Sequence, residues 1–217
     1  MPDKQLLIYC AGGLGREVLE LARQIGKWNI VAFIDDSCSE REVNGAPVYS
    51  FEEAKRAVGY TESSAVVASG EPQIVKKLYE RLEQTEISLA KLIHPSVHIP
   101  DSCLIEPGVI VQDRVFLGPN VILRKGCCID YNCALGHDVQ VEEYSHISMG
   151  CMVAGHVTIG DGTYIGAGAV IRDEVTIGKN CIIGMGSLVT KNIPDSVMAY
   201  GFPCRAVKEN TEGIVFR

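Results

Sequence analysis

The sequence lacks the features that mark several protein classes. It has no block of five or more like charges, and 27 Asp and Glu against 20 Lys and Arg give a net charge of −7. Nucleic-acid-binding domains normally carry a basic face, so we expect no nucleic acid partner. No stretch approaches the roughly eighteen apolar residues of a membrane span, and the apolar run in MPDKQLLIYC is shorter than a secretory signal. These absences predict a soluble, cytoplasmic protein.

Metal and disulfide frameworks are also missing. The nine cysteines are an odd number and include no CxxC pair. Hydrophobic residues make up 47% of the chain and charged residues 22%, which predicts a packed core rather than disorder. A length of 217 residues allows one large domain or two small ones.

An aliphatic residue returns every six positions from Ile93 onward without an insertion. A period of six fits neither an amphipathic helix nor a single strand, but it fits a β-solenoid whose short sides each bury one residue. Three sides close a triangular coil, so the series predicts between five and six coils. Its members are Ile93, Ile99, Ile105, Val111, Leu117, Leu123, Ile129, Leu135, Val141, Ile147, Val153, Ile159, Ile165, Ile171, Ile177, Ile183 and Val189.

Two further columns support tight corners. Residues four positions after each aliphatic are all small or β-branched, and five cysteines fall there, so we interpret those cysteines as buried fillers of a narrow prism. They are Cys103, Cys127, Cys133, Cys151 and Cys181. The preceding column is rich in Gly and Asn, which tolerate the positive φ of a sharp corner. Examples are Gly108, Asn120, Asn132, Gly150, Gly162, Gly168, Asn180 and Gly186.

The first ninety residues have a different pattern, that of a small Rossmann-like domain of parallel strands and helices. KQLLIYCAGGLGREVLELARQIGKWNIVAFIDDS predicts a strand, a glycine turn, a helix and a second strand; SSAVVASG and PQIVKKLYERL add another strand and helix. Gly12, Gly13 and Gly15 could cradle a phosphate at the helix N-terminus, or form only a tight packing turn. Asp35 and Asp36 follow the second strand, where a ribose hydroxyl or a base can be held.

The repeats, densest in IGDGTYIGAGAVI, resemble the hexapeptide-repeat acyltransferases over residues 93–208. This resemblance implies an α/β Rossmann-like domain over residues 1–90, followed by an all-β left-handed parallel β-helix over residues 91–217. It also implies a homotrimer that binds acyl-CoA in grooves between neighbouring solenoids, with Ala167 and Met185 as acetyl-CoA contacts. The segment GFPCRAVK is similar to the closing segment of that family.

A glycine-rich α/β unit directly before hexapeptide repeats resembles one bacterial group, whose members acetylate nucleotide-linked amino sugars or O-acetylate sialic acid. The resemblance implies that the first domain binds the nucleotide sugar. The implied contacts are Gly12, Gly13, Leu14, Asp35, Asp36 and Gly70. The family often has His where Leu14 stands and Gly where Cys10 stands, which leaves the identity of the nucleotide sugar open.

Two of the five histidines resemble functional residues of that group, within ALGHDVQVEEYSHISMG. By this resemblance His137 is the catalytic base and the adjacent Asp138 orients it, while His146 contacts acetyl-CoA. A histidine suits removal of a proton from an amine, and His146 is a candidate donor to the oxyanion. Asp130 stands at a further polar position and could hold the acceptor ammonium.

The other three histidines are interpreted as structural or solvent-facing. His94 begins the solenoid, His98 faces solvent, and His156 lies in a corner column.

His137 and His146 are nine residues apart, half an eighteen-residue coil. We therefore expect them at different edges of one prism, so that they converge only where two chains meet. A zinc site needs three or four convergent ligands, so we expect no metal.

The leading hypothesis is an acetyl-CoA-dependent N-acetyltransferase acting on a UDP-, dTDP- or GDP-linked 4-amino sugar, by direct transfer. O-acetylation of sialic acid and a non-catalytic scaffold are the alternatives.

Overall fold

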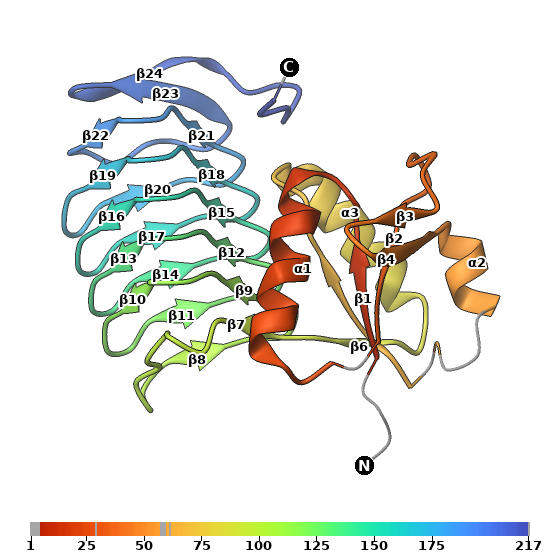
Figure 1. Ribbon diagram of the computed structural model, residues 1–217. Coiled ribbons are helices and arrows are strands. Elements are labelled where there is room, and N and C mark those ends of the chain that lie inside the picture. Colours follow the sequence, from red (N-terminus) through yellow and green to blue (C-terminus); the bar gives the residue numbers. More distant parts are fainter. Residues whose placement is uncertain (1–4, 29, 57–59, 61, 217) are drawn as a thin grey trace.

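The computed structural model describes residues 5–28, 30–56, 60 and 62–216 (Figure 1). An α/β domain at the N-terminal end lies beside a tall coil of short strands. The predicted fold, an α/β domain followed by a parallel β-helix of hexapeptide repeats, is confirmed.

The α/β domain is built on one six-stranded sheet with the order β3-β4-β2-β1-β5-β6. All neighbouring pairs are parallel except β3 and β4, which form an antiparallel hairpin that the sequence pattern did not predict. The strands are β1 (Gln5–Tyr9), β2 (Ile30–Ile34), β3 (Glu42–Val43), β4 (Ala46–Tyr49), β5 (Ser64–Val67) and β6 (Ser88–Leu89). The helices are α1 (Gly13–Ile25), the short unpredicted α2 (Phe51–Arg56) and α3 (Pro72–Glu83).

The helical spacing of Val18, Leu19, Ala22 and Ile25 in the sequence predicts one apolar face, and α1 buries most of it. Val18, Leu19 and Ala22 are buried against the sheet, and the helix ends at Gly26 in the left-handed conformation, with φ of 67°. Gly15 is required for packing, because an added Cβ would lie 2.1 Å from the carbonyl oxygen of Cys10. At Gly12 and Gly13, in contrast, an added Cβ would meet nothing within 4 Å. The packing interpretation therefore holds for Gly15, while the two glycines before it border open space.

The solenoid consists of two-residue strands stacked in three parallel sheets, in which each strand pairs with the strand eighteen residues away. One sheet continues into the C-terminal hairpin of β23 (Val197–Gly201) and β24 (Cys204–Glu209). The solenoid strands are β7 (Leu92–Ile93), β8 (Leu104–Ile105), β9 (Ile110–Val111), β10 (Phe116–Leu117), β11 (Ile122–Leu123), β12 (Cys128–Ile129), β13 (Ala134–Leu135), β14 (Gln140–Val141), β15 (His146–Ile147), β16 (Met152–Val153), β17 (Thr158–Ile159), β18 (Tyr164–Ile165), β19 (Val170–Ile171), β20 (Thr176–Ile177), β21 (Ile182–Ile183) and β22 (Leu188–Val189).

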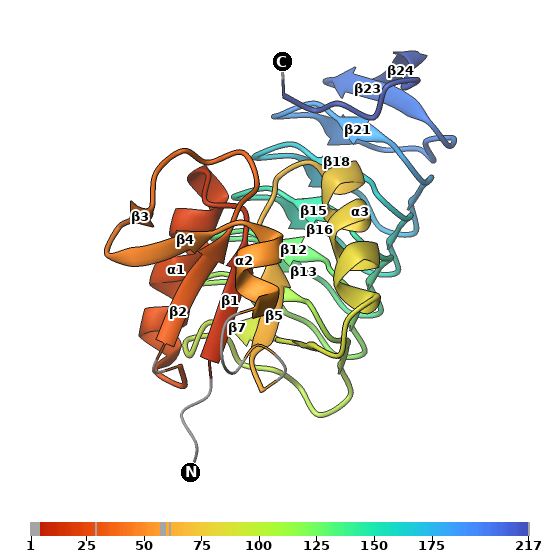
Figure 2. The same ribbon diagram turned by 90° about the vertical axis from the view of Figure 1, so that its right-hand side faces the viewer.

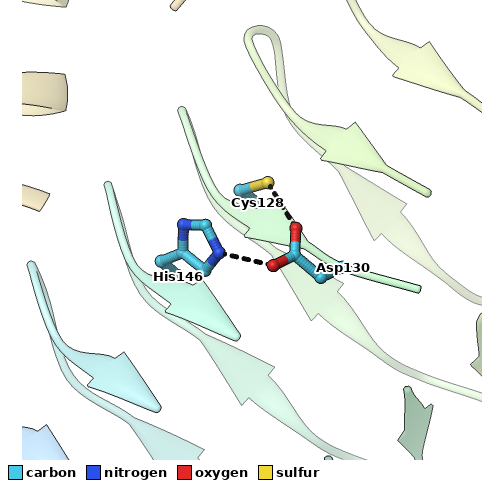
Figure 3. Close-up of side chains that lie close together, drawn as sticks. All are labelled: Cys128, Asp130 and His146. Carbon is cyan, nitrogen blue, oxygen red and sulfur yellow. Dashed lines mark hydrogen bonds and ion pairs between the residues drawn. The ribbon is translucent and has the colours of Figure 1, made fainter. Parts of the chain in front are cut away.

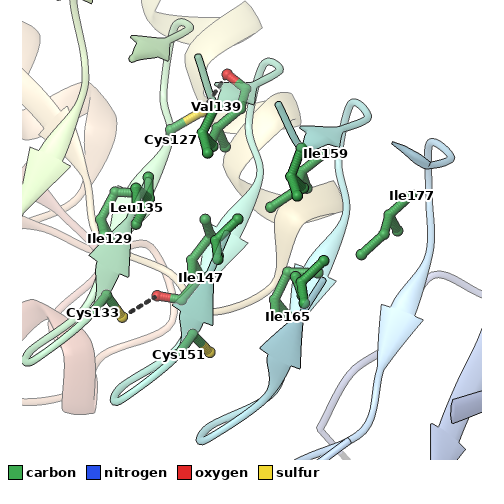
Figure 4. Close-up of a cluster of buried hydrophobic side chains, with 14 of the residues drawn as sticks. Cys127, Ile129, Cys133, Leu135, Val139, Ile147, Cys151, Ile159, Ile165 and Ile177 are labelled. Atoms are coloured by element: carbon green, nitrogen blue, oxygen red, sulfur yellow. Dashed lines mark hydrogen bonds between the residues drawn. The ribbon is translucent and has the colours of Figure 1, made fainter. Parts of the chain in front are cut away.

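The interior of the prism is filled as the two columns predict. Every aliphatic of the series from Ile105 to Val189 is buried, and Cys127, Cys133, Cys151 and Cys181 are buried with them (Figure 4). The eight Gly and Asn corner residues named above all have φ between 52° and 80°. None of the described cysteines forms a disulfide.

The series fails at Ile99, which is 38% exposed and belongs to no strand. The hydrogen-bond ladder explains this correction. On the same face one coil later, the N–H of Gly118 donates to the carbonyl of Leu135 over 2.8 Å. Pro100 occupies the position equivalent to Gly118 and has no N–H to donate, so this side of the first coil cannot complete its ladder.

The α/β domain packs on one of the three solenoid faces, the sheet that contains β7, β9, β12, β15 and β18 (Figure 2). Leu92, Ile110 and Cys128 from this face share a buried cluster with Leu19 and Val18 of α1. Burying apolar surface from both domains in one cluster favours a fixed arrangement of the two. No described helix is long and apolar enough to cross a membrane.

Tyr79 of α3 joins the two domains by a hydrogen bond. Its buried hydroxyl donates to the carbonyl of Gly108 over 2.8 Å and accepts from the N–H of Val67 at 3.1 Å.

Replacing an inward aliphatic tests the prism core. Ile159 is fully buried, so Ile159→Ala should lower the free energy of unfolding by about 2–5 kcal/mol through lost burial and a cavity. The matched control Ile99→Ala should change it by less than about 0.5 kcal/mol, because Ile99 lies outside the ladder. Urea unfolding at one fixed protein concentration measures both. Equal losses would contradict the distinction between the two positions.

Candidate active site

His137 and Asp138 lie at the solenoid corner that follows β13. Asp138 has φ of 60°, and its Oδ2 lies 2.8 Å from Nδ1 of His137. Its Oδ1 accepts a hydrogen bond of 2.9 Å from the side-chain amide of Asn120. The imidazole itself is about half exposed. The corner therefore presents a histidine toward solvent while a fixed carboxylate holds one of its nitrogens.

This contact sets which ring nitrogen is free. The hydrogen bonds from Asn120 and His137 hold the pKa of Asp138 below its ordinary value, so the group is a carboxylate near neutral pH. A carboxylate can only accept, so Nδ1 of His137 carries the proton that it donates. Nε2 of the neutral ring then has a free lone pair, which is the arrangement of a general base oriented by an acid.

His156 also belongs to this cluster, and the sequence analysis missed its part in it. Its predicted corner position is correct, with φ of 56°, but its ring packs edge-on against His137 with centroids 4.9 Å apart. Its Nδ1 lies 3.8 Å from Oδ2 of Asp138. The eighteen-residue period could have revealed this contact. His156 lies eighteen residues after Asp138, and Asn120 lies eighteen residues before Asp138.

His146 lies on a different face, in β15, where the α/β domain packs. Its Nε2 lies 2.9 Å from Oδ2 of Asp130, and the exposed fractions of the two side chains are 6% and 7% (Figure 3). Cys128 is the register partner of His146 in β12, and its thiol lies 3.6 Å from Oδ1 of Asp130. Asp130 therefore bonds to His146, and its contact with the acceptor ammonium stays a prediction.

A pocket of about 330 Å³ opens beside His146. It brings together five residues that the resemblance implied as binding residues, from both domains. They are Gly13, Leu14, Gly70, Asp130 and His146. Glu17, Ser148, Met149, Tyr164 and Phe216 complete its lining. The pocket thus joins the glycine turn of α1 to the face of β15.

Other predicted residues lie outside this lining. Asp35 accepts bonds from the N–H groups of Ala11 and Cys38, and Asp36 accepts from the N–H of Phe51 and from Arg81. Burial acts to raise the pKa of Asp35, but these backbone hydrogen bonds and the Ser37 hydroxyl outweigh it and hold the pKa below its ordinary value. Both carboxylates therefore already serve to fix the end of β2.

Two of the predicted acetyl-CoA contacts, Ala167 and Met185, lie on an edge that begins at Met149 in the pocket lining. Met185 is 81% exposed and Met149 is 49% exposed, with Ala167 between them in the same eighteen-residue column. His137 and Asp138 lie outside the pocket lining, at another corner of the prism.

The sequence analysis also missed that the C-terminal segment packs beside the pocket. The N–H groups of Val215 and Phe216 donate to the Glu71 carboxylate over 2.8 and 2.7 Å. The Phe216 ring packs edge-on against Tyr164, with centroids 5.6 Å apart, and covers Gly70. No local pattern signals this contact, because it joins positions about 145 residues apart.

The comparisons with known proteins support the two-part fold. The PglD N-terminal domain matches residues 5–82, and the bacterial transferase hexapeptide (six repeats) matches residues 156–191. The resemblance to hexapeptide-repeat acetyltransferases that carry an N-terminal α/β domain is therefore confirmed.

Three solved structures are similar to this chain over both of its domains. The acetyltransferase domain of PglB from Neisseria gonorrhoeae, in complex with acetyl coenzyme A, is 28% identical with a TM-score of 0.89, over 94% of this chain and 100% of that one. PerB from Caulobacter crescentus, in complex with CoA and GDP-perosamine, is 28% identical with a TM-score of 0.87, over 94% and 97%. WeeI from Acinetobacter baumannii has the same identity and TM-score, over 94% and 100%.

The space next to His137 offers a test of the corner cluster. A Cβ on Gly155 would lie 2.6 Å from Nε2 and Cε1 of His137, so Gly155→Ala should displace the ring and reduce acetyl transfer by about tenfold or more. The control Gly26→Asn changes a left-handed glycine with nothing within 4 Å, far from both histidines, and should retain activity. Steady-state kinetics compares the two; full activity in Gly155→Ala would show that ring placement is unimportant.

Proposed function

We propose that the protein is an acetyl-CoA-dependent N-acetyltransferase acting on the amino group of a nucleotide-linked amino sugar. The single observation that carries this proposal is the His137–Asp138 pair, which leaves Nε2 of a half-exposed imidazole free to accept a proton. The relatives with acetyl coenzyme A, and with CoA and GDP-perosamine, support both the donor and the class of acceptor.

The reaction needs only a base and an electrophile that are held together. The neutral amine nitrogen attacks the thioester carbonyl, a C–N bond forms, and the C–S bond breaks. CoA leaves as the thiolate, which becomes the thiol when His137 passes on the proton that it took from the amine. His137 accepts the proton that the amine loses, and Asp138 stabilises the imidazolium that results. We propose direct transfer without an acyl-enzyme, because Cys133, the thiol nearest to His137 in sequence, is buried inside the prism.

The pocket beside His146 suits the acceptor and the reacting end of the donor. Gly12 and Gly13 leave open space at the N-terminus of α1, where backbone N–H groups favour a phosphate. His146 bonds to Asp130 through Nε2, so it can donate to the developing oxyanion only through a proton on Nδ1, as in the imidazolium form. The exposed edge of Met149, Ala167 and Met185 is a surface along which CoA can extend.

The active site in this proposal is shared between subunits of a homotrimer. His146 lies in the pocket under its own α/β domain, whereas His137 lies at another corner and faces solvent. One chain therefore supplies the pocket with His146, and its neighbour supplies the base. A cytoplasmic location, expected from the sequence, stays a prediction.

Thiol release from acetyl-CoA in the presence of UDP-, dTDP- and GDP-linked 4-amino sugars tests the activity. We expect turnover on at least one, and His137→Ala should lower kcat/KM by about 10²–10⁴-fold, because the proton acceptor is lost. His98→Ala, at an exposed histidine away from the cluster, is the matched control and should keep wild-type kinetics. Turnover on sialic acid alone would replace the proposal with O-acetylation, and full activity of His137→Ala would refute the base.

A further inference from the structure

A second cluster of chemically reactive side chains lies beneath the pocket, and the proposed acetyl transfer uses only part of it. Cys128 and His146 are register partners in adjacent strands, and Asp130 lies two residues beyond Cys128 on the same face. One ligand atom from each of the three lies within 4.8 Å of the others (Figure 3). Thiolate, carboxylate and imidazole together form a donor set that zinc prefers.

One ring nitrogen of His146 lacks a partner among the described residues, while the other, Nε2, faces Asp130 inside the cluster. His146 is about nineteen-twentieths buried, yet its Nδ1 makes no hydrogen bond to any described residue. Cys128 and Asp130 are each 5% exposed, and the Cys128 thiol lies 3.6 Å from Oδ1 of Asp130.

Glu17 of α1 supplies a further acidic group from the other domain. It lines the same pocket as Asp130 and His146. Its carboxylate therefore faces the same space as the Asp130 carboxylate and the His146 ring. The pocket also opens a path from solvent to Asp130 and His146, two of the three ligands.

We propose that Cys128, Asp130 and His146 form a binding site for a thiophilic divalent cation, best matched by Zn²⁺, whose occupancy inhibits the enzyme. Three protein ligands leave a fourth tetrahedral position for water or Glu17. The inhibition rests on the proposed function, because a coordinated His146 is removed from the acetyl donor. Binding itself does not rest on it.

The chemistry of binding is a simple exchange. A metal–sulfur bond forms at Cys128 and the thiol proton leaves to solvent, so affinity should rise with pH. The second group of possible ligands in the described chain, His137, Asp138 and His156, contains no sulfur. A spectroscopic signal from a thiolate therefore distinguishes the two clusters.

Titration of the metal-free full-length protein with Co²⁺, in the absence of oxygen, tests the site directly. We expect thiolate-to-cobalt charge-transfer absorption at one ion per chain. Cys128→Ser should abolish this band, and Asp130→Asn should weaken binding by about tenfold or more. The matched control Cys127→Ser changes the adjacent buried thiol, which belongs to the prism interior, and should keep the band. Circular dichroism checks that each variant is folded.

The same variants separate binding from inhibition. Zn²⁺ should inhibit wild-type acetyl transfer over the concentration range in which it displaces Co²⁺, and Cys128→Ser should resist it. The metal site would be contradicted if no charge-transfer band appeared, or if Cys128→Ser retained the band. Either result is independent of whether the enzyme acetylates an amino sugar. A normal band without loss of activity would overturn only the inhibitory role.

Discussion

The register that places each residue against the one eighteen positions later is the constraint on which the structure depends. Backbone hydrogen bonds join every coil to the next, so a side chain repeats its environment once per coil. The narrow interior accepts one aliphatic per side and a small residue per corner, which explains both the period and most of the cysteines. Where Pro100 interrupts the ladder, the period continues in sequence but no strand forms.

The same register builds the chemistry on the outside of the prism. Asn120, Asp138 and His156 form one corner column, and together with His137 they fix a carboxylate between two imidazoles. Cys128 and His146 are stacked on another face, one coil apart. Since the α/β domain covers only that second face, its pocket includes His146 and leaves His137 at a corner outside it. A scaffold of this kind can bring the two histidines together most simply by pairing one chain with the next.

Much of the fold followed from the sequence because the period is long and nearly unbroken. The aliphatic series predicted the solenoid, and the spacing of Val18, Leu19 and Ala22 predicted α1. The His137–Asp138 contact followed from their adjacency at a corner. The contact of His156 with the cluster was missed because its place in a corner column, with positive φ, already explained the residue. Counting eighteen residues from Asp138 would have placed the two side chains in adjacent coils.

Other features depend on contacts that no local pattern encodes. The bond between Asp130 and His146 depends on which faces of two strands meet the α/β domain. The contact of Phe216 with Gly70 and Tyr164 depends on the path of a tail at the far end of the chain. Asp35 accepts a hydrogen bond from the N–H of Ala11 and Asp36 from that of Phe51, while their contact with a ribose stays a prediction. Such satisfaction of polar groups becomes visible only in three dimensions.

The central claim, that one chain supplies His146 and its neighbour His137, is tested most directly by mixing defects. His137→Ala chains and His146→Ala chains are co-expressed and purified as mixed assemblies. The control mixes chains that carry both substitutions with unchanged chains. If the site is shared, random mixing of the two single variants should restore about a quarter of wild-type activity, because some interfaces pair two intact histidines. Mixed assemblies as inactive as each single variant alone would contradict the account.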